Sequence, residues 1–106
     1  MKIMNLINKL FVSTPKVNLK QLIDEGAFLV DVRTAGEFAS GHIKGSVNIP
    51  LDKISAQIVK FNNKKNIIVF CRSGARSAQA KNILQQHGVT NVINGGSWDY
   101  VNQFVK

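Results

Sequence analysis

The stretch IIVFCRSGARSAQAKNIL, residues 67–84, decides the fold of this chain. Its first part, IIVF, is apolar without alternation, which is typical of a central parallel strand covered on both faces. Its last part carries apolar residues at helical spacing, at Ala80, Ile83 and Leu84, and Gly88 is suited to end such a helix. A strand that passes through a short loop into a helix is the repeating unit of a parallel sheet flanked by helices.

The same alternation of strands and helices extends over the rest of the chain. Short apolar strands are expected within residues 27–32, 46–50 and 91–94. Helical patterns occupy residues 17–26, 34–41, 51–61 and 97–105. The first of these helices has Asn18 as its expected N-cap and Gly26 as its end. The predicted fold class is therefore α/β, a parallel sheet with helices on both faces.

The chain is strongly basic. Fourteen Lys and Arg residues against six Asp and Glu residues give a net charge of +8, which favours an anionic partner. Nucleic-acid binding proteins usually cluster such charge along one element or mix it with aromatic residues. Here the lysines are scattered, and only Lys64 and Lys65 are adjacent. We therefore interpret the charge as a solvated basic surface, suited to a small anionic substrate, and expect no nucleic-acid partner.

The length and the N-terminal residues predict one domain with a short extension. At 106 residues the chain can build a single core. Residues 2–11 follow an amphipathic helix pattern, so residues 1–14 are predicted as a helix with its connector and residues 15–106 as the domain. No apolar run is long enough to cross a bilayer, and the start is a poor signal peptide. With a single cysteine no internal disulfide is available, and we expect a cytoplasmic protein.

That single cysteine, Cys71, stands where chemistry is expected. Sites in open α/β sheets lie beyond the carboxyl ends of the strands, and Cys71 ends one strand just before a helix N-terminus. Unpaired N–H groups at the helix start, a turn at Gly74 and the guanidinium groups of Arg72 and Arg76 would all stabilise a thiolate. A buried structural cysteine is the plainer alternative. The combination favours a reactive thiol.

Three separate motifs resemble the single-domain rhodanese family of thiosulfate-type sulfurtransferases. CRSGARSA is similar to the active-site loop of that family, FLVDVRTAGEFASGHIKGSVNIP to its upstream signature, and VINGGSWDYV to its closing segment. The likeness runs from about Val17 to Phe104. It implies a three-layer fold with about five parallel strands. Lys44 and Ser46 depart from the family pattern in a turn and change neither the thiol nor its loop, although a lysine near the site could alter the choice of donor.

The resemblance also implies a mechanism. Cys71 would take the outer sulfur of an anionic donor such as thiosulfate, carry it as a persulfide and pass it to cyanide or to a thiol, which could belong to a protein. Backbone N–H groups of the loop would hold the sulfur, and Arg76, with Arg72, would bind the anionic end of the donor. The loop residues assigned in this way are Arg72, Ser73, Gly74, Ala75, Arg76 and Ser77. No metal or organic cofactor is expected.

Two further charged residues are assigned supporting roles. Asp31 interrupts an apolar strand, and a buried carboxylate needs partners, so we expect it to orient Arg33 or loop N–H groups as a structural acid. His42 and His87 are interpreted as structural groups, and their spacing matches no metal site.

Three alternatives stay open beside sulfur transfer to a small acceptor. Phosphatase or arsenate reductase chemistry uses a loop that resembles C-x5-R, but here four residues separate Cys71 from Arg76, which favours a tighter ring for one sulfur atom. A non-enzymatic interaction module of the same fold would typically lack the loop cysteine. A protein sulfur carrier would differ in its partner and share the chemistry.

Overall fold

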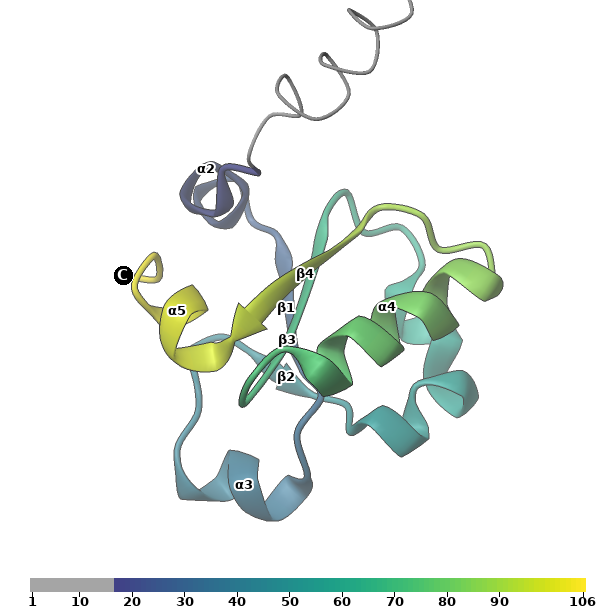
Figure 1. Cartoon of the computed structure of the whole chain (residues 1–106). Coiled ribbons are helices and arrows are strands. Elements are labelled where there is room, and N and C mark those ends of the chain that lie inside the picture. Colours follow the sequence, from purple (N-terminus) through teal and green to yellow (C-terminus); the bar gives the residue numbers. More distant parts are fainter. Residues whose placement is uncertain (1–16) are drawn as a thin grey trace, which may run out of the picture.

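The computed structural model describes residues 17–106. They form a sheet of four parallel strands in the order β2-β1-β3-β4 (Figure 1). The strands are β1 (Phe28–Asp31), β2 (Val47–Asn48), β3 (Ile67–Cys71) and β4 (Val92–Ser97). The α/β prediction is confirmed, and each strand overlaps a segment whose pattern predicts one, although β4 continues to Ser97, beyond the predicted residues 91–94.

The strand count is lower than the resemblance implies. The sheet of residues 17–106 has four strands and not about five. The reason is local: Asn18 already caps the first described helix by accepting the Gln21 N–H at 3.0 Å, which leaves no further strand between residue 17 and β1. The helix predicted for residues 2–11 lies outside the described residues.

The helices surround the sheet on both faces and at its carboxyl edge. They are α2 (Leu19–Asp24), α3 (Ala35–Ser40), α4 (Ala75–Gln86) and α5 (Trp98–Asn102), with two 3₁₀ helices, η1 (Leu51–Lys53) and η2 (Ser55–Phe61). In Figure 1, α4 with η1 and η2 lies on one side of the strands and α2 with α5 on the other, while α3 lies beyond β1. None of the described helices combines the length and apolar character needed to cross a membrane.

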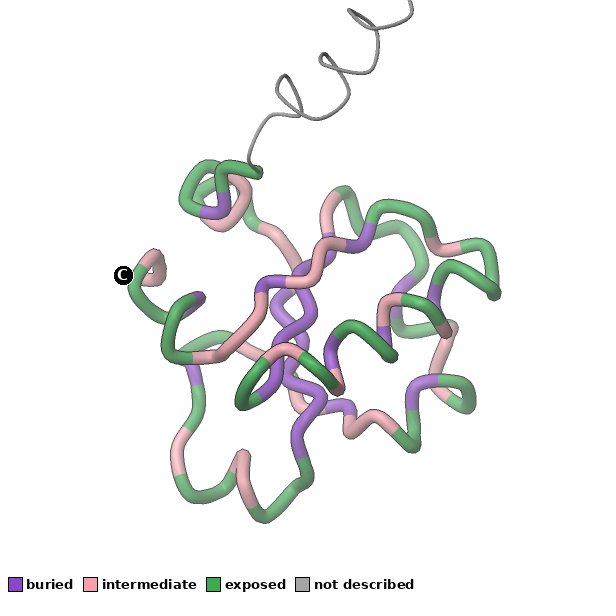
Figure 2. The backbone as a smooth tube through the Cα atoms, viewed as in Figure 1, coloured by how far each residue is buried: buried purple, intermediate pink, exposed green. Residues whose placement is uncertain are grey.

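Strand β3 holds the two layers together. All five of its residues are buried, and they alternate between two apolar clusters (Figure 2). Ile67, Val69 and Cys71 face the cluster that α4, η1 and η2 cover, and Ile68 and Phe70 face the one below α2 and α5. The prediction that IIVF is a central strand covered on both faces is thus confirmed.

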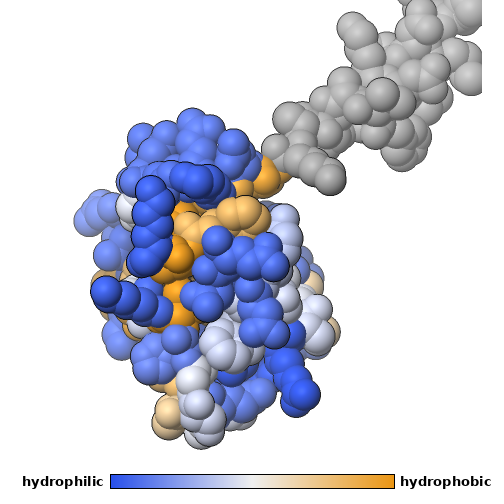
Figure 3. All heavy atoms as spheres, turned by 90° about the vertical axis from the view of Figure 1, so that its left-hand side faces the viewer, coloured by the Kyte–Doolittle hydropathy of each residue, from blue (hydrophilic) through white to orange (hydrophobic). Residues whose placement is uncertain are grey.

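The surface reflects the composition. Figure 3 shows the side that carries α2 and α5: it is largely hydrophilic, with an apolar band between the hydrophilic areas. This face is therefore mostly polar and charged, in agreement with the solvated surface that the scattered lysines predict.

Residues 51–61 are helical, as their apolar spacing predicts, but they form the two 3₁₀ helices η1 and η2. Gln57, at φ −122° and ψ 30°, interrupts the segment. The fully buried Ile54 follows Leu51 by three residues, and the buried Phe61 follows Ile58 by three. A spacing of three matches the 3₁₀ repeat, so tight turns bring the same side chains into the core.

Candidate active site

Cys71 is the last residue of β3, and the loop after it leads directly into α4. The helix begins at Ala75, with Gly74 as its N-cap at φ +101°. A Cβ atom at Gly74 would stand 3.4 Å from the Gly96 Cα. The left-handed backbone and this close approach both favour glycine, so the sequence expectation of a glycine-dependent turn is met.

The Cys71 sulfur lies enclosed below this loop. The side chain is buried, and Sγ accepts a hydrogen bond from the Gly74 backbone N–H at 3.0 Å. The Ser77 hydroxyl lies 3.5 Å from the sulfur. Burial raises the pKa of the thiol, but hydrogen bonds from the Ser77 hydroxyl and from the backbone N–H groups of Ser77, Gly74 and Ser73 outweigh it and lower the pKa below the ordinary value. The loop therefore stabilises negative charge on this sulfur.

The Asn94 side chain, on β4, forms hydrogen bonds that hold the loop in place. Its side-chain oxygen accepts from the Ser77 hydroxyl at 2.7 Å and from the Gly96 N–H at 2.9 Å. Its amide nitrogen donates to the Gly74 carbonyl at 3.2 Å. These bonds fix both ends of the turn around Cys71. The sequence patterns did not single out Asn94, because nothing local to residue 94 shows that β4 lies beside the loop.

Arg76 is engaged by an acidic residue that the sequence patterns also did not single out. Its Nη1 and Nη2 donate to the Glu37 carboxylate at 2.7 and 3.0 Å. Glu37 in turn forms a capping box with Thr34 at the start of α3. The Thr-x-x-Glu spacing signals the cap, but not the bond to Arg76. The hydrogen bonds from Arg76 and then from the Thr34 backbone N–H lower the pKa of Glu37 to about 2. A donor-binding role for Arg76 stays a prediction.

Arg72 is placed differently. Its side chain is exposed, and no described carboxylate lies within ion-pair distance of it. It lines a hollow of about 400 Å³ together with Arg33, Glu37, Trp98 and others. Arg72 thus lies beside the loop without an ion-pair partner among the described residues.

Asp31 and Arg33 form a buried ion pair below the same edge of the sheet. Arg33 donates from Nη2 to Asp31 Oδ2 at 2.7 Å and from Nε to Oδ1 at 3.0 Å. It also donates to the Gly41 carbonyl at 2.7 Å and stacks over the Trp98 ring, 4.4 Å from its centre. These contacts join β1, the end of α3 and the start of α5. They agree with the structural role expected for Asp31. None of these hydrogen bonds involves Cys71.

The Nδ1 atom of each histidine lies within hydrogen-bonding distance of the backbone carbonyl oxygen four residues earlier in the chain. His42 Nδ1 lies 2.8 Å from the Phe38 carbonyl oxygen, and its ring stacks on Phe38. His87 Nδ1 lies 2.9 Å from the Ile83 carbonyl oxygen. Within residues 17–106 no group of three or more His, Cys, Asp or Glu side chains could hold a metal ion.

A thiol below a ring of N–H donors, at the end of a central parallel strand, invites comparison with known proteins. The family model of the rhodanese-like domain matches residues 16–102, most of the chain. The chain belongs to the rhodanese-like domain family.

Named relatives of this rhodanese-like domain include two bacterial enzymes. The thiosulfate sulfurtransferase PspE of Escherichia coli is 38% identical over 69 residues, which cover 63% of this chain and 66% of the relative. A sulfurtransferase of Allochromatium vinosum is 37% identical over 70 residues, which cover 66% and 65%. The chain thus spans slightly less than two-thirds of these relatives.

Among solved structures, a rhodanese with anions from E. coli superimposes with a TM-score of 0.64 at 34% identity. The superposition covers 71% of this chain and 91% of that one.

Proposed function

We propose that this rhodanese-like domain is a sulfurtransferase that carries sulfane sulfur on Cys71 as a persulfide. One observation carries the proposal: the Cys71 thiol has a lowered pKa, and its sulfur accepts a hydrogen bond from the Gly74 N–H at 3.0 Å. The thiolate is the nucleophilic form of cysteine. The N–H groups that stabilise the thiolate are also suited to stabilise the negative charge of a persulfide anion.

The proposed reaction has two steps and consumes no oxidant or reductant. The Cys71 thiolate attacks the outer sulfur of thiosulfate, a bond forms between the two sulfur atoms, and sulfite leaves with the electron pair of the broken sulfur–sulfur bond. Cyanide or a thiolate then attacks the outer sulfur of the persulfide, and the Cys71 thiolate leaves. With cyanide the product is thiocyanate, and the enzyme returns to its starting state.

The relatives and the loop length support sulfur transfer over oxyanion chemistry. The named relatives are sulfurtransferases, one of them with thiosulfate in its name, and the E. coli rhodanese structure contains anions. The four residues between Cys71 and Arg76 form a small ring around the sulfur, with the Gly74 N–H directed inward. A protein sulfur carrier would use the same first step and differ in its acceptor.

Turnover is the test of this proposal. The purified protein is incubated with thiosulfate and cyanide at pH 8, and thiocyanate is measured over time, with the Cys71→Ser protein as control. We expect thiocyanate from the wild type and none above background from Cys71→Ser. Equal rates from the two proteins would overturn the role of Cys71. Absence of turnover with thiosulfate and with a small-molecule persulfide, each offered to folded protein, would overturn the enzymatic proposal.

A further inference from the structure

The guanidinium group expected to meet the donor is bound to a carboxylate. Arg76 uses both terminal nitrogens on Glu37, at 2.7 and 3.0 Å. Glu37 is held from its other side, because its Oε1 accepts the Thr34 backbone N–H at 3.0 Å and lies 3.1 Å from the Thr34 hydroxyl. The first turn of α3 therefore fixes the carboxylate, and the carboxylate fixes the arginine of the sulfur-binding loop.

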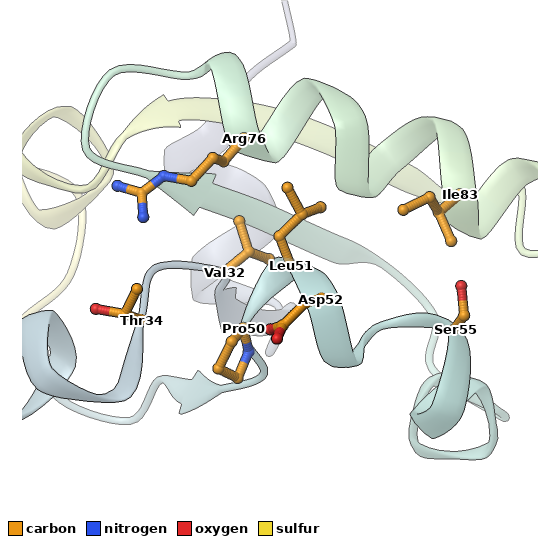
Figure 4. A pocket seen from close by; sticks show the side chains of 8 residues that line it. All are labelled: Val32, Thr34, Pro50, Leu51, Asp52, Ser55, Arg76 and Ile83. Atoms are coloured by element: carbon orange, nitrogen blue, oxygen red, sulfur yellow. The ribbon is translucent and has the colours of Figure 1, made fainter.

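The pair stands between two hollows beside the loop. Arg76 lines a hollow of about 460 Å³ whose apolar wall includes Val32, Leu51 and Ile83 (Figure 4). Figure 4 shows the Arg76 side chain extending away from Ile83 toward the end where Thr34 lies. Glu37 lines the other hollow, which holds Arg72. Both side chains of the pair remain about one-third exposed, so an anion in solution can compete for Arg76.

The charge balance of the loop follows from this pairing. Glu37 is ionised at neutral pH, and the hydrogen bonds from Arg76 and Thr34 lower its pKa further, to about 2. Glu37 and Arg76 together carry no net charge, which leaves Arg72 as the loop cation without an ion-pair partner among the described residues; the Glu37 and Asp99 side chains line the same hollow as Arg72. To bind Arg76, a small dianion must displace the Glu37 carboxylate, which forms the bidentate pair that a guanidinium group prefers.

We propose that Glu37 sets the strength with which this site binds an anionic sulfur donor, because it occupies the Arg76 guanidinium that the sulfonate end of the donor would otherwise bind. This inference deepens the proposed function and rests on it for the identity of the donor. Glu37 acts through Arg76 and is a positioning residue. Its presence disfavours a small dianion such as thiosulfate relative to donors that do not depend on Arg76.

Glu37→Gln removes the negative charge of this side chain but keeps its hydrogen bond in the cap of α3. Glutamine also serves in a capping box, since its side-chain oxygen can accept the Thr34 N–H, but it does not form an ion pair with Arg76. Glu25→Gln is the matched control, because it makes the same change on α2, where Glu25 accepts from Gln21 and takes no part in the loop. Binding of thiosulfate is measured by calorimetry in the Cys71→Ser background, so that no sulfur is transferred.

We expect Glu37→Gln to lower the Kd for thiosulfate by about fivefold, because it removes a charge that competes for a partly exposed cation. Glu25→Gln should leave the Kd within about twofold. Glu37→Gln combined with Arg76→Gln should bind several-fold more weakly than Glu37→Gln alone. A Kd that is unchanged or raised in Glu37→Gln overturns the proposal, and so does a double variant that binds as tightly as Glu37→Gln.

Turnover separates this inference from the proposed function. With Cys71 present, Glu37→Gln should lower the KM for thiosulfate and leave kcat within about twofold, because the N–H groups around the sulfur are untouched. If binding changes as expected and no variant transfers sulfur, the inference on Arg76 stands and the proposed reaction fails. If the wild type transfers sulfur and the Kd of Glu37→Gln is unchanged, the reaction stands and the inference fails.

Discussion

The backbone N–H of Gly74 donates to Cys71 Sγ across 3.0 Å, from a residue that holds a left-handed φ of +101°. The two facts are connected. The left-handed backbone at Gly74 turns the chain into α4, and the first turn of that helix places the Ser77 hydroxyl 3.5 Å from the same sulfur. Hydrogen bonds from Ser77, Gly74 and Ser73 lower the pKa of the thiol, so its acidity depends on the conformation of the loop.

Gly74→Ala should disturb both properties. The left-handed backbone costs a side chain about 1–2 kcal/mol, and the new Cβ would meet Gly96 Cα at 3.4 Å. We expect the free energy of unfolding in urea to fall by about that amount and the pKa of Cys71 to rise. Gly36→Ala is the control, since a Cβ at Gly36 in α3 would meet no atom within 4 Å, and the change should be neutral or slightly stabilising. Equal stability of Gly74→Ala and wild type would contradict this account of the turn.

Ser77→Ala tests the hydrogen bonds that stabilise the thiolate. The hydroxyl has one proton and three neighbouring acceptors, Cys71 Sγ, the Gly74 carbonyl and Asn94 Oδ1. Its loss should raise the pKa of Cys71, because burial continues to oppose the charge while one donor is gone. The thiolate fraction at pH 7 then falls, and the pH curve for alkylation by iodoacetamide shifts to higher pH.

Ser73→Ala provides the comparison for that curve. The Ser73 side chain is exposed, and only its backbone N–H contributes to the lowered pKa of Cys71. Its alkylation curve should coincide with that of the wild type. If the curve for Ser77→Ala also coincides with that of the wild type, the Ser77 hydroxyl does not lower the pKa of Cys71, and the backbone N–H groups alone do.

Asp31→Asn should destabilise the fold strongly. Asp31 is fully buried and Arg33 nearly so, and the change leaves a buried guanidinium without its counter-ion, which typically costs about 3–5 kcal/mol. Unfolding in urea at pH 7 measures the change. Asp24→Asn breaks an exposed pair with Lys20 and should shift the midpoint little. Similar midpoints for the two variants would show that the buried pair contributes no more than the exposed one.

Arg76→Ala should impair the use of thiosulfate more than Arg72→Ala. Removal of Arg76 leaves the Glu37 carboxylate unpaired beside the loop, whereas removal of Arg72 leaves a neutral pair. We expect a rise in KM for both variants, several-fold larger for Arg76→Ala. Addition of Glu37→Gln to Arg76→Ala should recover part of the loss. Equal KM values for wild type and Arg76→Ala would remove Arg76 from donor binding.

The features that the sequence predicted correctly are those encoded by neighbouring residues. The unalternating IIVF run predicts a strand buried on both faces, and Gly74 predicts the turn before α4, because both signals lie within a few positions. Asp31 and Arg33 are two residues apart, so their pairing could also be anticipated. The spacing in residues 51–61 predicted a helix, but not that tight 3₁₀ turns would place its apolar side chains.

The contacts that the sequence did not predict join segments far apart in the chain. Glu37 and Arg76 are 39 positions apart, and Ser77 and Asn94 are 17 apart. Such pairs meet because β1, β3 and β4 end at one edge of the sheet, and a single sequence does not reveal which of the polar side chains near those ends come into contact. The position of Cys71 at the end of β3 and the turn at Gly74 were therefore predictable, whereas the residues that position the loop were not.

The most direct test of sulfur transfer through Cys71 is the intact mass of the reduced protein after incubation with thiosulfate. The account predicts a gain of one sulfur atom, about 32 Da, in the wild type and no gain in Cys71→Ser. Addition of cyanide should then return the wild type to its original mass and release thiocyanate. An unchanged mass of folded wild type with both thiosulfate and a small-molecule persulfide, or the same gain in Cys71→Ser, would contradict it.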